Sequence, residues 1–150
     1  MPITTNLKER ILKGLVGQNN TFYGSAYVGL SSTNPAEEVN EPALLDSEGN
    51  PTGYKRVLIG TYSQDGTYKF GAVENGVIKN DEFIYFPESN GSWGAKLHYF
   101  VLYSAETGGN LLAYGLLASG GTATPIEVTE PRTVVMFRPE TLVISIQDEA

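Results

Sequence analysis

Two residue types that occur only once, Trp93 and His98, stand five positions apart in the most hydrophobic part of the chain. Histidine is the commonest acid–base catalyst. Because His98 is the single histidine of the chain, a Ser-His-Asp triad could use no other base. Trp93 could offer an aromatic platform to a sugar. No Gly-x-Ser-x-Gly nucleophile elbow accompanies them. The pair therefore raises a catalytic and a ligand-binding hypothesis.

The elements expected around these two residues favour a structural role. Residues 96–104 are apolar at both odd and even positions, which predicts a central strand buried on both faces. His98 shares a face with Phe100 and Leu102, whereas catalytic residues usually lie on loops. Trp93 lies in a Gly-rich loop. Its indole could bond a loop carbonyl at the edge of the core, or it could contact a ligand or a neighbouring subunit.

Metal chemistry finds little support in the residue types present. The chain has no cysteine, which excludes disulfides and thiolate ligands, and one histidine cannot build a His-rich zinc site. Asp46, Glu48 and Asn50 place oxygen ligands at alternate positions. They depart from the EF-hand pattern, because Gly49 comes one position early and Val57 stands where the closing Glu belongs. We expect no metal.

Enzymatic and cofactor motifs are also missing from the sequence. The neighbouring carboxylates Glu37–Glu38 and Asp81–Glu82 would point to opposite faces of a strand, which does not suit a glycosidase pair. There is no phosphate-binding loop and no dinucleotide fingerprint. We therefore expect no catalytic residue and no cofactor.

Charge and hydropathy narrow the choice of partners. The net charge is −7 and the ten basic residues are scattered, so we expect no nucleic-acid binding. No window approaches the roughly 18 apolar residues that span a bilayer, so we expect no membrane insertion. The first residues, 1–4, lack the apolar region of a signal peptide, which predicts synthesis in a cytoplasm.

A short amphipathic helix is predicted near the N-terminus. Asn6 is a candidate N-cap with Glu9 completing a loose capping box, and Gly17 is a natural stop. About three turns of helix are not stable alone, so the apolar stripe must dock on its own core or on a neighbouring subunit. These candidate assembly contacts are Leu7, Ile11, Leu12 and Leu15.

The rest of the chain has strand character, with turns expected at Asp65–Gly66 and Asn75–Gly76. Repeated short strands predict a mainly β fold, an antiparallel β-sandwich with one short N-terminal helix. We expect a helical docking segment over residues 1–20 and a single sandwich domain over 21–150. The polar loop 31–53 is long enough to serve a function. The predicted strands cover 22–30, 54–62, 82–87, 96–104, 111–119, 124–129, 133–137 and 141–146.

Four ordered stretches resemble a family of tailed-phage virion structural proteins. They are "AYVGLSSTNPAEE" (26–38), "GYKRVLIG" (53–60), the run from "IYFPESNGSWG" to "GGNLLAYGLL" (84–117) and "FRPETLVISI" (137–146). The resemblance implies a non-enzymatic, β-rich component of the virion, made in the bacterial host cytoplasm. It also implies contacts with other capsid or tail proteins and a homo-oligomer, for which a trimer is one option.

The resemblance leaves the position on the particle open between a tail fibre, a head fibre and a capsid decoration protein. A second hypothesis is a binding module in which Trp93 or the 31–53 loop contacts host glycan. A third is a polysaccharide depolymerase, which the size of the chain disfavours because such enzymes usually need a long solenoid.

Overall fold

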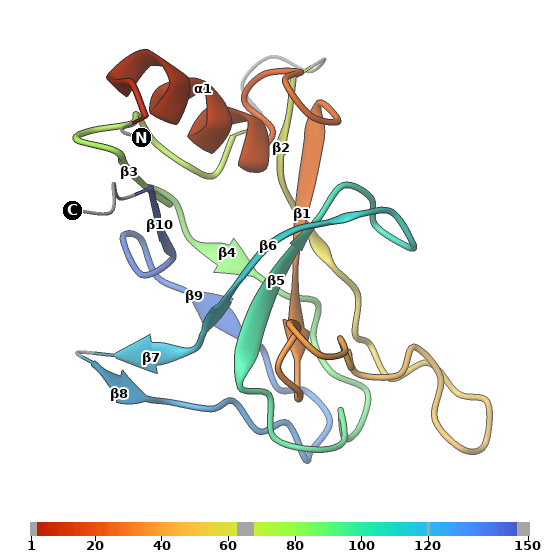
Figure 1. Ribbon diagram of the computed structural model, residues 1–150. Helices are drawn as coiled ribbons and strands as arrows, with labels where there is room; N and C mark the ends of the chain where they lie inside the picture. The colour runs from red at the N-terminus through yellow and green to blue at the C-terminus, as the bar shows by residue number, and fades with distance from the viewer. Residues whose placement is uncertain (1–2, 63–67, 120, 147–150) are drawn as a thin grey trace. The chain divides into compact units, whose positions relative to one another are not determined.

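The computed structural model describes residues 3–62, 68–119 and 121–146 (Figure 1). Within these ranges the fold is mainly β, with antiparallel pairs and one short N-terminal helix, as predicted from the sequence. The elements are α1 (Thr5–Leu15), β1 (Ser25–Ser31), β2 (Val57–Thr61), β3 (Val77–Lys79), β4 (Ile84–Tyr85), β5 (Tyr99–Tyr103), β6 (Leu111–Leu116), β7 (Ala118–Ser119), β8 (Thr122–Ala123), β9 (Met136–Phe137) and β10 (Val143–Ser145).

The largest sheet has the strand order β2-β1-β5-β6, and three smaller pairs are β10-β3, β4-β9 and β7-β8. β5 and β6 run antiparallel and side by side in Figure 1, with Tyr99 opposite Leu116. β5 is an internal strand, and its consecutive residues Phe100, Val101 and Leu102 are all buried. The prediction of a central strand with two apolar faces is therefore confirmed.

The chain separates into two compact units. The first comprises residues 1–27, 58–84 and 136–150, and the second comprises 28–57 and 85–135. Each contains fully buried aliphatic side chains, such as Leu12 and Ile78 in the first and Leu30 and Leu102 in the second.

The helix begins earlier than the sequence suggested. The N-cap is Thr4, not Asn6: Thr4 has an extended backbone, and its Oγ1 accepts a hydrogen bond from the Leu7 N–H at 3.2 Å. Glu9 forms an i,i+4 ion pair with Lys13 at 3.0 Å. The Thr4 hydroxyl lies three residues before the Leu7 N–H, which has no partner within the helix, and satisfies that donor. Asn6 lies inside the first turn, so its side-chain amide does not act as the N-cap.

The helix ends at the glycine predicted to stop it. Gly17 has a φ of +78°, and the Gln18 N–H donates to the Lys13 carbonyl at 2.8 Å, which is a Schellman closure. A Cβ on Gly17 would collide with the Gly60 carbonyl of β2. Gly17 therefore serves both the left-handed backbone and a close approach to the strand.

Two further predictions from turn and strand patterns are confirmed. Asn75 and Gly76 have φ values of 54° and 73°, and Glu74 and Val77 exchange backbone hydrogen bonds across them, as in a two-residue hairpin. The strand predicted over 141–146 should alternate buried and exposed side chains, and it does so at its start: Leu142, directly before β10, is buried, and Val143 is exposed.

Other predicted elements differ or lie outside the description. The strand expected over 54–62 is shorter in the structure, where β2 covers Val57–Thr61. Tyr54 and Arg56, which precede it, contribute their side chains to the network described below. Residues 124–129 form an isolated bridge, Leu97 to Ile126, rather than a strand. The Asp65–Gly66 turn lies outside the described residues.

Candidate ligand cleft

Trp93 belongs to a buried aromatic trio in the second unit. It is 4% exposed, and its Nε1–H donates to the Thr52 carbonyl at 3.0 Å. Its ring meets Tyr54 edge-to-face at 5.3 Å and Phe86 at 6.3 Å between centroids. This geometry is the one expected when an indole closes the edge of a core and bonds a loop carbonyl.

The hydroxyl of Tyr54 connects this trio to a buried ion pair. It donates to Glu41 Oε1 at 2.6 Å and accepts the Leu30 N–H at 3.0 Å. Arg56 binds the same carboxylate in a fork, with Nε 3.0 Å from Oε1 and Nη2 2.7 Å from Oε2. Both oxygens of Glu41 are therefore engaged by charge-assisted or phenolic donors.

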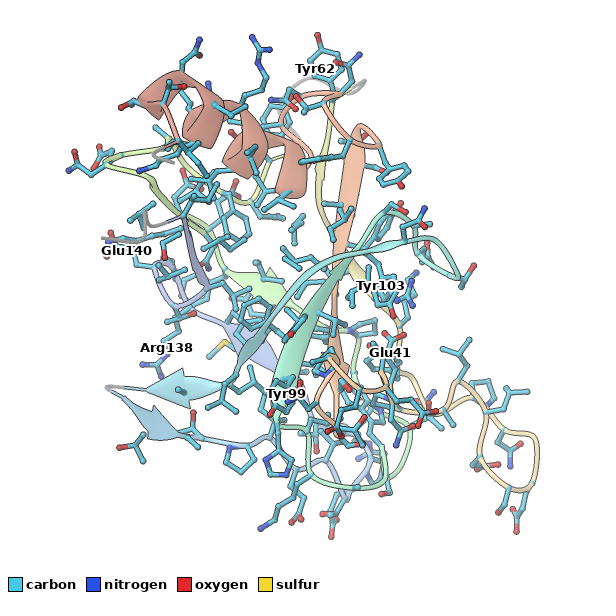
Figure 2. All side chains as sticks on the ribbon, in the orientation of Figure 1. Glu41, Tyr62, Tyr99, Tyr103, Arg138 and Glu140 are labelled. Atoms are coloured by element: carbon cyan, nitrogen blue, oxygen red, sulfur yellow. The ribbon has the colours of Figure 1, made fainter. Side chains whose placement is uncertain are left out.

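The far side of the Arg56 guanidinium is equally well occupied. Its carbon lies 3.6 Å from the centroid of the Tyr103 ring, a cation–π contact. Its Nη1 donates to the Ala105 carbonyl at 2.9 Å and to the Gly108 carbonyl at 2.7 Å. Glu41 and Tyr103, both labelled in Figure 2, thus contact the guanidinium from two sides. Its bonds to the Ala105 and Gly108 carbonyls also stabilise the turn between β5 and β6.

The pKa values of Tyr54 and Arg56 are both raised in this network. Burial raises the pKa of Tyr54 above its ordinary value, and the Glu41 carboxylate raises it further. Burial acts to lower the pKa of Arg56, but hydrogen bonds to Glu41 and its charge outweigh that and raise it overall. Tyr54 is therefore a neutral donor and Arg56 a fixed cation at neutral pH.

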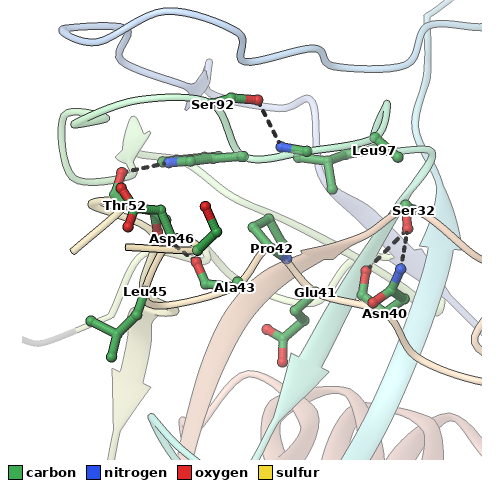
Figure 3. Close-up of a pocket in the computed structure, with 14 residues that line it drawn as sticks. Ser32, Asn40, Glu41, Pro42, Ala43, Leu45, Asp46, Thr52, Ser92 and Leu97 are labelled. Atoms are coloured by element: carbon green, nitrogen blue, oxygen red, sulfur yellow. Dashed lines mark hydrogen bonds between the residues drawn. The ribbon is translucent and has the colours of Figure 1, made fainter. Parts of the chain in front are cut away.

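Beside this network lies a cleft of about 380 Å³ in the second unit (Figure 3). The 40–47 loop forms one wall and residues 92–97 form the other. Asn40 Nδ2 donates to Ser32 Oγ at 2.9 Å, and Ser92 Oγ accepts the Gly94 N–H at 3.0 Å. The lining mixes small polar groups with the apolar Pro42, Ala43, Leu45 and Leu97.

The two carboxylates that line the cleft already serve the fold. Glu41 is bound by Arg56 and Tyr54, and Asp46 Oδ1 accepts the N–H groups of Glu48 at 2.8 Å and Asn50 at 2.9 Å. His98 is not among the lining residues. The cleft can therefore offer hydrogen bonds and apolar contact to a small polar ligand, rather than a free acid–base pair.

No group of three potential His, Asp or Glu metal ligands exists among the described residues. Asp46, one of the oxygen ligands that the sequence places at alternate positions, instead caps its own turn, since its Oδ1 accepts two backbone N–H groups.

A protein-family model described as podophage GP4 fiber I protein gp80 matches residues 2–131. The chain belongs to this family. This fibre-family protein is accordingly a phage virion fibre component that associates with other virion proteins, which confirms the predicted virion family. No curated protein matches the chain. Its eleven-residue α1 is too short to cross a membrane, and the described residues contain no helix that could.

The structure divides the four predicted assembly contacts of the fibre-family protein. Leu12 is fully buried, Ile11 and Leu15 are half-buried, and Leu7 is 47% exposed. The stripe thus docks on its own unit through its C-terminal half. A contact with a neighbouring subunit stays a prediction that would fall on Leu7.

His98 takes part in the sheet through its backbone. Its N–H donates to the Ser31 carbonyl at 2.9 Å, and its carbonyl accepts the Leu117 N–H at 2.8 Å. Trp93 lines the cleft but presents little surface. A ligand or subunit contact through Trp93 stays a prediction, limited to the edge of the ring that borders the cleft.

Sequence reasoning missed Glu41 and Arg56, the two residues that organise the second unit. Fifteen positions separate them, and Glu41 lies in a loop without periodicity. The one sequence signal for this network was the position of Arg56 directly before an apolar strand. A charged side chain that is buried beside such a strand needs an oppositely charged or hydrogen-bonding partner.

Proposed function

We propose that the chain is a non-enzymatic virion structural protein that assembles symmetrically as a homo-oligomer, as a tail fibre, head fibre or capsid decoration. The match over residues 2–131 carries this proposal, because it runs from α1 through β8 and draws on both compact units. Symmetric self-association is the usual route by which such a small chain builds a larger particle component.

The chemistry of the second unit supports a non-enzymatic role. The cleft carboxylates Glu41 and Asp46 are held by structural hydrogen bonds, and His98 lies outside the cleft. The test is release of reducing sugars from host surface polysaccharide by the wild-type protein. Release that disappears in His98→Ala would contradict the proposal, and no release above buffer would support it.

The position on the particle is tested by immunogold electron microscopy of purified virions with antibodies against the chain. Label distributed over the shell would support a decoration or head-fibre role, and label at the tail would support a tail fibre. A chain absent from purified virions by mass spectrometry would contradict a structural role altogether.

The N-terminal helix is proposed as the docking segment within residues 1–20, acting through Leu7. Deletion of the whole helix would confound the test, because Leu12 and Val16 are fully buried. Leu7→Lys should fold normally but reduce incorporation into virions. Lys8→Ala changes the neighbouring residue and is the control; equal incorporation of both variants would remove the helix from the assembly surface.

A second candidate function is binding of host glycan, which the cleft beside Trp93 favours. Ala95 lines the cleft and is exposed, so Ala95→Trp would fill it without removing a structural hydrogen bond. Ala36→Trp, on an exposed residue outside the lining, is the matched control. Glycan-array binding lost only in Ala95→Trp supports this function, whereas no binding by wild type counts against it.

A further inference from the structure

The two edge strands of the four-stranded sheet, β2 and β6, differ in whether further backbone pairs with them. At the β2 edge the Lys69 N–H donates to the Ile59 carbonyl at 2.8 Å, and Tyr68 forms a bridge with Gly60. At the opposite edge β6 pairs only with β5, and none of the described residues bonds to its outer side. One edge of the sheet is covered and the other is left open.

The open edge lacks the usual protection against strand pairing. Natural edge strands carry charges or prolines that discourage association. β6 reads LLAYGL, and the twenty residues 107–126 around it contain no Asp, Glu, Lys, Arg or His. Tyr114 and Leu116 are 45% and 50% exposed, so the strand presents apolar side chains as well as backbone.

The hydrogen-bond alternation shows which backbone groups are available. The Leu117 N–H donates to the His98 carbonyl. Bonding residues alternate along an antiparallel strand, so Gly115 and Ala113 face β5 while Tyr114 and Leu116 direct their N–H and C=O groups outward. These outward groups are what an added strand would bind.

We propose that the open edge of β6 pairs with β6 of a second copy of this chain, antiparallel about a twofold axis. The inference rests on the proposed homo-oligomer and locates its interface. Pairing Tyr114 with its own counterpart places Leu116 near Leu112, the residue at which the β5–β6 register shifts, so apolar residues meet along the strand. The main-chain hydrogen bonds continue the sheet across the axis.

Charge favours a second copy over another kind of partner. Each chain carries a net charge of −7, so two copies repel unless they meet where charge is absent. The uncharged 107–126 stretch provides such a place on both copies at once. A basic partner would gain no ion pair there, because β6 offers it no carboxylate.

A single introduced cysteine tests the register directly, since the chain has none of its own. Residues that share a hydrogen-bonded antiparallel pair lie about 5.5 Å apart at Cα, which a disulfide can bridge. Tyr114→Cys should form a covalent dimer under mild oxidation. Leu45→Cys, on a loop residue 56% exposed in the same unit, is the control. Equal cross-linking of both variants would overturn the pairing.

Sedimentation of the full chain provides the second arm. Wild type should be a dimer or another even-numbered oligomer, and Tyr114→Lys should weaken the dimer at least tenfold while Leu45→Lys does not. Matching circular dichroism melts would show that the variant folds. A wild-type trimer would overturn the β6 pairing and leave the proposed homo-oligomer standing, whereas a monomer at all concentrations would count against both.

Discussion

Arg56 and Glu41 form a two-pronged ion pair, with Nη2 2.7 Å from Oε2 and Nε 3.0 Å from Oε1. The Arg56 and Glu41 side chains are only 9% and 18% exposed, so water could solvate little of either charge if its partner were removed. The pair joins the long polar loop to the residue that precedes β2. Glu41, within this loop, is thereby fixed to the segment that leads into β2.

Removal of one partner should therefore be costly. Glu41→Ala leaves the Arg56 guanidinium charged and largely buried, and we expect a loss of about 3 kcal/mol in the free energy of unfolding. Urea denaturation measures it. Glu106→Ala breaks the exposed pair with Lys55 in the same unit and should cost less than about 0.5 kcal/mol. Similar losses in both variants would contradict the structural role of Glu41.

Alkaline pH should weaken the fold through Tyr54. Its pKa is raised in the folded state, so the folded chain keeps a proton that the unfolded chain releases near pH 10. Stability from this group is complete below that pH and declines above it. Urea midpoints at pH 8 and 11 should fall less in Tyr54→Phe than in wild type. Parallel pH slopes in the two proteins would refute the assignment.

Asn80 should be irreplaceable at the end of β3 in the first unit. Its fully buried amide donates to the Glu82 carbonyl at 2.9 Å and the Arg138 carbonyl at 2.8 Å, and Oδ1 accepts the Leu142 N–H at 2.9 Å. Asn80→Ala should cost roughly 1–3 kcal/mol by leaving these groups unpaired. Asn80→Asp preserves the shape but removes both donors.

At neutral pH the Asn80→Asp variant should be at least as unstable as Asn80→Ala, because its carboxylate faces two carbonyl oxygens. Acidification should return part of the loss, since the protonated carboxyl donates one hydrogen bond. Thermal melts at pH 4 and 7 distinguish the two variants. An Asp variant as stable as wild type at pH 7 would show that the amide donors contribute nothing.

The close packing around Gly29 on β1 should tolerate no added methyl group. A Cβ there would lie 2.5 Å from Glu41 Oε1 and 2.7 Å from the Tyr54 hydroxyl. Gly29→Ala should therefore displace the network and cost roughly 1–3 kcal/mol. Gly91→Ala, in open space in the same unit, should be near neutral. Equal melting temperatures for the two variants would contradict the packing.

The sequence by itself determined the features that depend on a few neighbouring residues. The stop at Gly17, the Asn75–Gly76 hairpin and the alternation of Leu142 and Val143 follow from backbone conformation and side-chain period. The N-cap was misplaced by two residues, because several small polar side chains compete near a helix start and only geometry selects Thr4.

Only the tertiary structure decided how distant polar groups meet. Glu41, Tyr54, Arg56 and Tyr103 carry no shared local pattern, and their network forms because a buried charge must find partners wherever the chain brings them. The same applies to Trp93, whose indole found the Thr52 carbonyl 41 residues away. Long-range pairing depends on the path of the whole chain, which local propensity does not encode.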